Sequence, residues 1–336
     1  MKYYNLLKLN SILKNHRLKF LGLWGLHVLK KRYLAVNFDP VLSCNLRCRM
    51  CYFTDKEYNK TMKGYFPVND LDLFAKAILP RAVKLQIGCG AEPTLYKDLN
   101  AIIKLGKKYK VPYISLTTNA NLVKKDDLVK WISNGLDEIT ISMHGVKKDT
   151  YTYFMQNSDY THFKEILEDI SEIKNKFNSF KLRINYTFNE DNFNELKYFF
   201  DEFKNVNLDI LQIRPITKLG ETEYNNFSFK NIIPYYEIVY KQLKKESAIR
   251  NIIFIAPTLK QMKTSDQSQD SIISEYIYCY VSPNYFFKED FNWKNETYEE
   301  FSKRTKLARK IFKHIFSSKK QIENLKNKTL NYSISK

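Results

Sequence analysis

Hydrophobic residues follow two different patterns along this chain, and segments with one pattern alternate with segments with the other. Short apolar runs, typical of buried strands, occupy residues 32–42, 83–88, 111–117, 137–142, 181–187 and 208–213. Apolar residues recur every three or four positions, as in amphipathic helices, at residues 68–79, 96–109, 126–135, 163–177, 194–203 and 233–243. Strands that alternate with helices of this length form βαβ units. The pattern therefore predicts an α/β fold with a parallel sheet, as a partial or full barrel of the TIM type over residues 33–257, with 251–255 as a final strand.

Two segments flank this alternating region. Within residues 1–32, the stretch 20–29 is apolar with basic residues on both sides, too short to span a bilayer and without a signal-peptide cleavage site. The pattern fits a basic amphipathic element that contacts a membrane surface, and it fits equally a helix packed on the main domain. Residues 258–271 are polar and predict a linker. Residues 272–336 predict a small irregular C-terminal appendage.

Charge and cysteine content narrow the class of protein. The 336 residues carry a formal net charge of +19, which favours anionic partners. No run of Lys or Arg with interleaved aromatic residues stands out, so we expect no dedicated nucleic-acid surface. Three of the five cysteines lie within eight residues, unlike the spaced pairs of a secreted disulfide framework. We therefore expect a cytoplasmic protein that uses these thiols for metal.

The three clustered cysteines are Cys44, Cys48 and Cys51, in the stretch SCNLRCRMCYF. A structural zinc site normally takes four protein ligands, and no fourth Cys or His lies nearby in sequence. A [4Fe-4S] cluster held by three thiolates leaves its fourth iron open to another molecule. The loop therefore predicts one such cluster, while a zinc site that borrows a distant ligand stays as the alternative.

The spacing C-x3-C-x2-C directly after a first strand resembles the radical S-adenosylmethionine (radical SAM) enzymes, and the resemblance covers roughly residues 34–220. GCGAEPTL looks like the family's Gly-Gly-Glu-Pro motif, TTNA like its Thr-Asn-Gly turn, and ISMHG like its Ser-Leu-Asp-Gly motif. INYTFNEDN and LQIRPI are similar to later strands of its peptide-modifying members. The resemblance implies that SAM contacts Met50, Gly90, Ala91, Glu92, Pro93, Thr118, Asn119, Ser142, Asn185 and Arg214.

Individual positions refine this implied site. Glu92 would hold the amine of SAM, and Thr118 with Asn119 would lie near its ribose. The family's arginine about a dozen residues after Ser142 is missing, so the SAM carboxylate needs another partner, and Arg183 or Arg214 is the candidate. No catalytic residue is assigned beyond the cluster and SAM, and His144, where Asp is common, is assigned no role.

The resemblance implies a partial (β/α)6 barrel with SAM at the carboxyl ends of the strands. It also implies reductive cleavage of SAM to a 5′-deoxyadenosyl radical that abstracts hydrogen from a substrate. We favour a peptide or protein side chain as the substrate. A membrane-linked or surface-glycan intermediate, RNA, and a non-catalytic metal-binding protein are the alternatives. A flavodoxin or ferredoxin would donate the electron, and the N-terminus would supply any peripheral membrane contact.

The C-terminal stretch YIYCYVSPNYFF is similar to a degenerate SPASM or twitch region, in which only Cys279 remains. One cysteine cannot hold a cluster, so we expect no auxiliary cluster.

Overall fold

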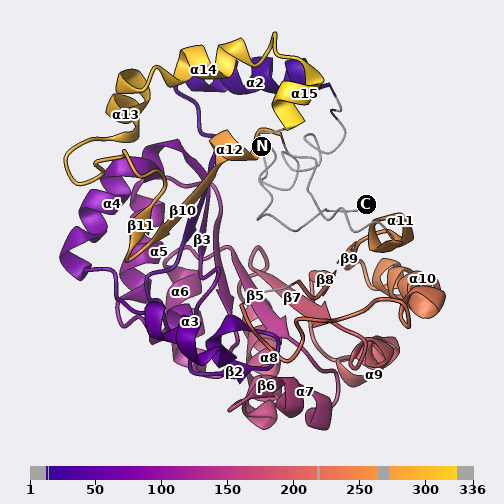
Figure 1. The fold of residues 1–336 in the computed structure, drawn as a ribbon. Helices are drawn as coiled ribbons and strands as arrows, with labels where there is room; N and C mark the ends of the chain where they lie inside the picture. Colours follow the sequence, from indigo (N-terminus) through magenta and orange to yellow (C-terminus); the bar gives the residue numbers. More distant parts are fainter. Residues whose placement is uncertain (1–12, 14, 218–219, 264–271, 324–336) are drawn as a thin grey trace.

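The computed structural model describes residues 13, 15–217, 220–263 and 272–323 (Figure 1). Its strands are β1 (Leu34–Phe38), β2 (Arg47–Cys48), β3 (Ala82–Ile87), β4 (Ile114–Thr118), β5 (Glu138–Met143), β6 (Met155–Gln156), β7 (Lys181–Phe188), β8 (Ile210–Pro215), β9 (Ile253–Ile255), β10 (Tyr278–Ser282) and β11 (Tyr285–Phe286). Its helices are α2 (His16–Val28), α3 (Lys56–Thr61), α4 (Leu71–Ile78), α5 (Leu99–Lys108), α6 (Lys125–Ser133), α7 (Lys148–Phe154), α8 (Tyr160–Lys174), α9 (Phe199–Glu202), α10 (Ile233–Ile249), α11 (Leu259–Lys263), α12 (Ser274–Ile277), α13 (Tyr298–Arg304), α14 (Leu307–Lys313) and α15 (Lys319–Glu323).

One curved sheet organises the molecule, with helices packed along its outer face (Figure 1). Among the described residues its strand order is β11-β10-β1-β3-β4-β5-β7-β8-β9, so that β9 and β11 are the two edges. Every neighbouring pair is parallel except β10 with β11. The predicted α/β alternation and parallel sheet are confirmed, and residues 253–255 form the expected final strand of the barrel.

The C-terminal region differs from its prediction as an irregular appendage. Strand β10 pairs in parallel with β1, with Ala35 opposite Tyr278, and thereby extends the barrel sheet. The physical reason is an alternation of period two. Cys279 and Val281 are fully buried, whereas Tyr278 and Tyr280 between them are half-buried. The boundary at residue 257 therefore does not separate this segment from the barrel sheet.

The helix pattern is confirmed where the hydrophobic spacing is regular. Helix α8 begins after Asp159, whose side chain accepts hydrogen bonds from the backbone N–H groups of Thr161 and His162. The prediction of one helix over 194–203 is wrong in its first half, because residues 193–198 form a 3₁₀-helix. Phe193, Leu196 and Phe199 are all buried at intervals of three, the repeat of a 3₁₀-helix.

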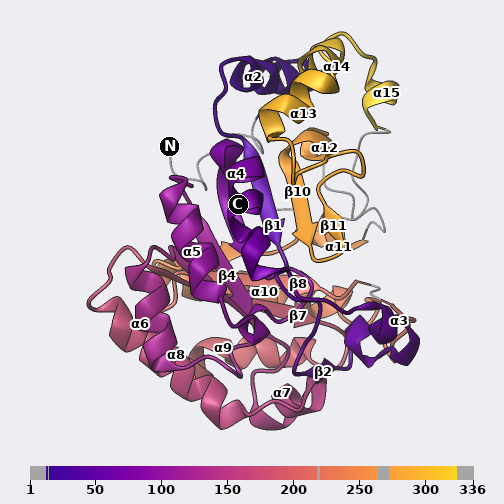
Figure 2. The same ribbon diagram turned by 90° about the vertical axis from the view of Figure 1, so that its left-hand side faces the viewer.

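The predicted N-terminal helix exists as α2, and its packing partners are C-terminal helices (Figures 1 and 2). The ring of Phe20 lies 5.0 Å from that of His314, and the ring of Trp24 lies 5.2 Å from that of Phe312. Helices α2 and α14 are therefore antiparallel neighbours. In the described part of the chain, no helix combines the length and apolarity needed to cross a bilayer.

Candidate active site at the carboxyl ends of the strands

The cysteine loop follows β1 and is fixed by a small sheet of its own. Strand β2 pairs with β6, with Arg47 opposite Gln156 and Cys48 opposite Met155. The backbone N–H of Arg49 donates to the carbonyl oxygen of Phe154 at 2.9 Å. The end of helix α7 and strand β6 therefore hold the loop in position.

All three cysteines of this loop are free and half-buried. Burial raises the pKa of Cys44 to about 12 and also raises the pKa values of Cys48 and Cys51. Cysteine binds metal as the thiolate, so a bound metal cation would be needed to favour the ionised form of these three thiols. Within the described residues, no three His, Cys, Asp or Glu side chains already surround a single-ion site. A four-iron cluster does not require one, because each cysteine binds a different iron atom.

Glu92 connects two of the predicted SAM motifs. Its buried carboxylate accepts hydrogen bonds from the hydroxyl groups of Thr94 and Thr118, both at 2.6 Å. It also accepts from the backbone N–H of Asn119 at 2.8 Å. Burial raises the pKa of Glu92, and these donors oppose that shift. The structure thus ties the end of β4 to the turn after β3, and the carboxylate is already well supplied with donors.

Asn119 joins the same two turns to the cysteine loop. Its side-chain amide donates to Oδ1 of Asn45 at 2.8 Å and lies 3.8 Å from Sγ of Cys44. The backbone N–H of Glu92 in turn donates to the carbonyl oxygen of Ser43 at 2.9 Å. The loops after β1, β3 and β4 therefore form one hydrogen-bonded unit.

Two glycines in the turn after β3 are required by close packing. Gly88 has a φ of +80°, and a Cβ atom there would lie 2.4 Å from the carbonyl oxygen of Thr117. A Cβ atom at Gly90 would lie 2.6 Å from the hydroxyl oxygen of Tyr52. Small residues here let neighbouring chain segments approach the turn closely.

The structure adds Asp39, Tyr52 and Tyr280 to the residues selected from the sequence. Asp39, at the end of β1, is 1% exposed and accepts hydrogen bonds from the backbone N–H groups of Cys89 at 2.6 Å and Gly90 at 3.1 Å. The hydroxyl of Tyr280 donates to the same carboxylate at 2.8 Å, and the hydroxyl of Tyr52 donates to the carbonyl oxygen of Gly90. Burial raises the pKa of Asp39. An acidic residue that ends a buried strand was the available sequence signal; nothing local indicated Tyr280.

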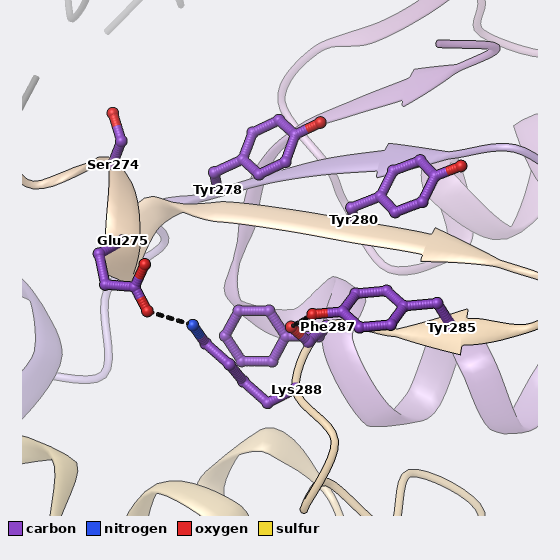
Figure 3. A pocket seen from close by; sticks show the side chains of 7 residues that line it. All are labelled: Ser274, Glu275, Tyr278, Tyr280, Tyr285, Phe287 and Lys288. Carbon is purple, nitrogen blue, oxygen red and sulfur yellow. Dashed lines mark hydrogen bonds and ion pairs between the residues drawn. The ribbon is translucent and has the colours of Figure 1, made fainter. Parts of the chain in front are cut away.

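Tyr280 also lines a pocket of about 360 Å³ beside strands β10 and β11 (Figure 3). Tyr278 and Tyr280 project from β10 and Tyr285 from β11, while Lys288 forms an ion pair with Glu275. The rings of Tyr280 and Tyr285 stack with their centroids 6.1 Å apart. Through Asp39, this aromatic pocket is connected to the turn that carries Gly90.

Ser142 and Asn185 lie side by side on β5 and β7, as their strand register requires. Oδ1 of Asn185 is buried and has no hydrogen-bond partner among the described residues. An orphaned buried acceptor in the carboxyl half of a barrel strand fits a bound molecule with hydrogen-bond donors.

The two arginines that could bind the SAM carboxylate lie at different depths in the barrel. Arg183 lies deeper in the barrel, where its guanidinium is 3.2 Å from the carboxylate of Glu138. Arg214 is level with the end of β7 and donates to Oγ1 of Thr187 at 2.9 Å. Its charge also favours the thiolate form of Cys51, although burial dominates and raises the pKa of that thiol. Arg214 is thus the arginine on the side of the cysteine loop.

Met50 lies apart from the Glu92 network. It is buried against Phe154 and Ile216, and its sulfur accepts a hydrogen bond from the side-chain amide of Asn189 at 3.0 Å. This packing gives Met50 a structural role, and its contact with SAM stays a prediction.

Comparisons with known proteins show which family the central part of the chain resembles. Residues 40–204 match the family model described as the radical SAM superfamily. The chain is 29% identical to the GTP 3′,8-cyclase of Aquifex aeolicus over 60% of this chain and 62% of that protein. It is 27% identical to a probable GTP 3′,8-cyclase of Metallosphaera sedula over 62% of this chain and 63% of the relative. The chain thus spans somewhat less than two thirds of these curated relatives.

Solved structures share the fold. Streptococcus suis SuiB bound to S-adenosylmethionine superposes with a TM-score of 0.58 at 16% identity, over 80% of this chain and 63% of SuiB. Native anSMEcpe with bound AdoMet also gives 0.58, at 18% identity over 85% of this chain and 84% of that one. The cysteine loop and the matching family model lead to one conclusion: residues 40–204 belong to the radical SAM superfamily, whose cofactors are a [4Fe-4S] cluster and S-adenosylmethionine.

Proposed function

We propose that this chain is a radical SAM enzyme in which Cys44, Cys48 and Cys51 hold the [4Fe-4S] cluster. When bound, the cluster and SAM supply reductive cleavage to a 5′-deoxyadenosyl radical, which abstracts hydrogen from a substrate. The observation that carries the proposal is the hydrogen-bonded unit of the loops after β1, β3 and β4, which joins the thiols to Glu92 and Asn119.

The chain's own residues orient the cofactors. Gly88 and Gly90 allow close approach of the chain to the turn, and Asp39 fixes that turn through its backbone N–H groups. We assign the SAM carboxylate to Arg214, because Arg183 lies deeper and is paired with Glu138. Asn185 offers a buried acceptor to a donor of SAM.

A peptide or protein side chain is our preferred substrate. Two observations support it. The similarity to SuiB and anSMEcpe reaches beyond the barrel, over 80% and 85% of the chain, and structures of both proteins include peptide complexes. GTP is the second candidate, because the curated relatives that match the barrel are named as GTP 3′,8-cyclases.

The first test measures cluster content and 5′-deoxyadenosine formation. The wild type, reconstituted anaerobically and supplied with SAM and dithionite, is expected to bind about four iron atoms and to form product. The triple variant Cys44→Ala, Cys48→Ala, Cys51→Ala is expected to lose both. Cys279→Ala is the matched control, since Cys279 is buried in the sheet away from the loop. Iron binding that survives in the triple variant would refute the ligand assignment.

A second experiment separates the two substrate classes. The loaded enzyme is incubated with GTP or with synthetic peptides encoded beside its gene, and substrate masses are followed with a flavodoxin or ferredoxin as electron donor. Turnover of a peptide with unchanged GTP supports our preferred substrate, and consumption of GTP overturns it.

A further inference from the structure

Helix α2 is apolar on the face that it turns away from the protein. Its inner face buries Phe20, Leu23 and His27. Its outer face carries large apolar side chains that are between 38% and 68% exposed, namely Leu18, Leu21, Leu26, Val28 and Leu29. A surface helix normally presents polar residues to water on that side, and a helix that is apolar all round is normally covered.

An aromatic row continues this apolar surface onto α14. The ring of Phe312 lies 5.2 Å from that of Trp24 and 5.4 Å from that of Phe316, which is 71% exposed. Trp24 is three residues from Leu21 and four from Val28, so it borders the outer face of α2. We call the outer face of α2 together with Phe312 and Phe316 the α2–α14 surface.

The charged residues of the two segments that form this surface are all basic. Residues 1–38 and 305–322 contain no Asp or Glu, whereas 15–32 contain five Lys or Arg and 306–320 contain six. The acidic residues of the adjacent helix α13 are already engaged. Glu299 pairs with Arg81 at 2.6 Å, and the side chain of Glu300 accepts from the N–H of Thr297 at 2.7 Å. Exposed leucines and phenylalanines are therefore surrounded by cations.

We propose that the α2–α14 surface docks on an anionic lipid bilayer, with its apolar side chains in the headgroup region and its cations against the lipid phosphates. Peripheral membrane helices combine these two features. An RNA ligand would use the cations but not the leucines, and a second copy of the chain would bring two cationic surfaces together. Since no described helix spans a membrane, the contact is interfacial.

Docking leaves the candidate active site accessible. Helix α2 leads into the amino end of β1, and the cysteine loop follows the carboxyl end of the same strand (Figure 2). The five residues of β1 separate the two levels by about 16 Å. The site therefore faces away from the bilayer, and a water-soluble substrate reaches it while the enzyme is docked.

The test is co-sedimentation of the reconstituted full-length chain with vesicles of phosphatidylcholine, with or without 30 mol% phosphatidylglycerol (about one lipid in three, chosen to give a strongly anionic surface). We expect at least about tenfold tighter binding to the anionic vesicles, weakened by salt. The variant Leu21→Gln, Leu26→Gln, Phe316→Gln is expected to bind at least about tenfold more weakly. Ile238→Gln on α10 is the matched control, since Ile238 is 66% exposed and lies elsewhere.

Circular dichroism confirms that the variants are folded. A second variant, Lys30→Gln, Lys31→Gln, Lys313→Gln, is expected to lose the preference for anionic vesicles while its apolar residues are intact. Equal binding of the apolar triple variant and the wild type would overturn the proposal. Self-association of the wild type that the apolar triple variant abolishes would also overturn it. The same holds for RNA that displaces the vesicles and still binds the apolar triple variant. None of these readouts depends on radical chemistry.

Discussion

Removing one hydroxyl group from the C-terminal strand β10 is expected to weaken the turn after β3, which we propose binds SAM. In Tyr280→Phe, the carboxylate of Asp39 loses the donor at 2.8 Å but keeps the backbone N–H groups of Cys89 and Gly90. Asp39 is 1% exposed, so water has little access to replace the lost bond. A hydrogen bond to an ionised group contributes about 1.5–3 kcal/mol. With its backbone donors left, we expect the free energy of unfolding to fall by about 1.5–2 kcal/mol.

The effect should also appear in cofactor affinity. If about half of the lost free energy had oriented the turn, the dissociation constant of SAM would rise about fourfold. Urea denaturation measures the first quantity and equilibrium dialysis of SAM against the reconstituted protein measures the second. Tyr285→Phe is the matched control, because the hydroxyl of Tyr285 donates to the carbonyl oxygen of Phe287 at 2.8 Å and not to Asp39.

The pH dependence gives a further check. Burial raises the pKa of Asp39 above 3.8, and the bond from Tyr280 lowers it, so the variant should have the higher folded-state pKa. The stability difference between wild type and Tyr280→Phe is then greatest at neutral pH and shrinks as Asp39 is protonated on acidification. A difference below about 0.5 kcal/mol, or one independent of pH, would refute the reasoning.

Three other substitutions test the turn after β3, the bonds of Glu92 and the packing of helix α2. Gly88→Ala should destabilise the protein by more than about 2 kcal/mol in urea denaturation, because residue 88 has a positive φ and the added Cβ would lie 2.4 Å from a carbonyl oxygen. Gly22→Ala is the control at an exposed position with free space, and an equal effect of the two substitutions would contradict this prediction. Thr118→Val removes a 2.6 Å donor from buried Glu92 and should cost about 1–3 kcal/mol and weaken SAM binding, whereas Thr118→Ser should not. Burial lowers the pKa of His27 from 6.5, so the unfolded chain takes up that proton first and stability should fall as pH drops below about 6.5. Melting temperatures of His27→Gln should show a shallower decline, and an unchanged decline would exclude His27 as its source.

The sequence predicts the barrel well because each of its parts is local. The alternation of apolar runs with amphipathic helices predicts β1, β3, β4, β5, β7, β8 and β9, and the cysteine spacing marks the loop that we propose binds the cluster. Helix α8 follows its pattern, since Phe163, Ile166 and Ile170 all face the core. Where the spacing changes to three, between Phe193 and Phe199, the predicted α-helix gives way to a 3₁₀-helix.

What the sequence could not predict is long-range pairing. The alternation in YIYCYVS is visible, but nothing in it indicates that Tyr280 would lie beside Asn37 and reach Asp39. The double role of Glu92 was hidden for the same reason. A Gly/Pro turn suggests a ligand contact, whereas the bonds to Thr118 and Asn119 exist only once β3 and β4 are adjacent.

The pairing of β1 with β10 also bears on how the protein is made. During synthesis β1 and the cysteine loop leave the ribosome early, whereas Tyr280 emerges 241 residues after Asp39. Until then the edge of β1 is uncovered and the carboxylate of Asp39 lacks its hydroxyl donor. Such a late, non-local contact slows folding and exposes a strand edge to aggregation. We therefore expect nascent chains stalled before residue 278 to be recognised by chaperones, and insertion of the cluster to be productive mainly after release.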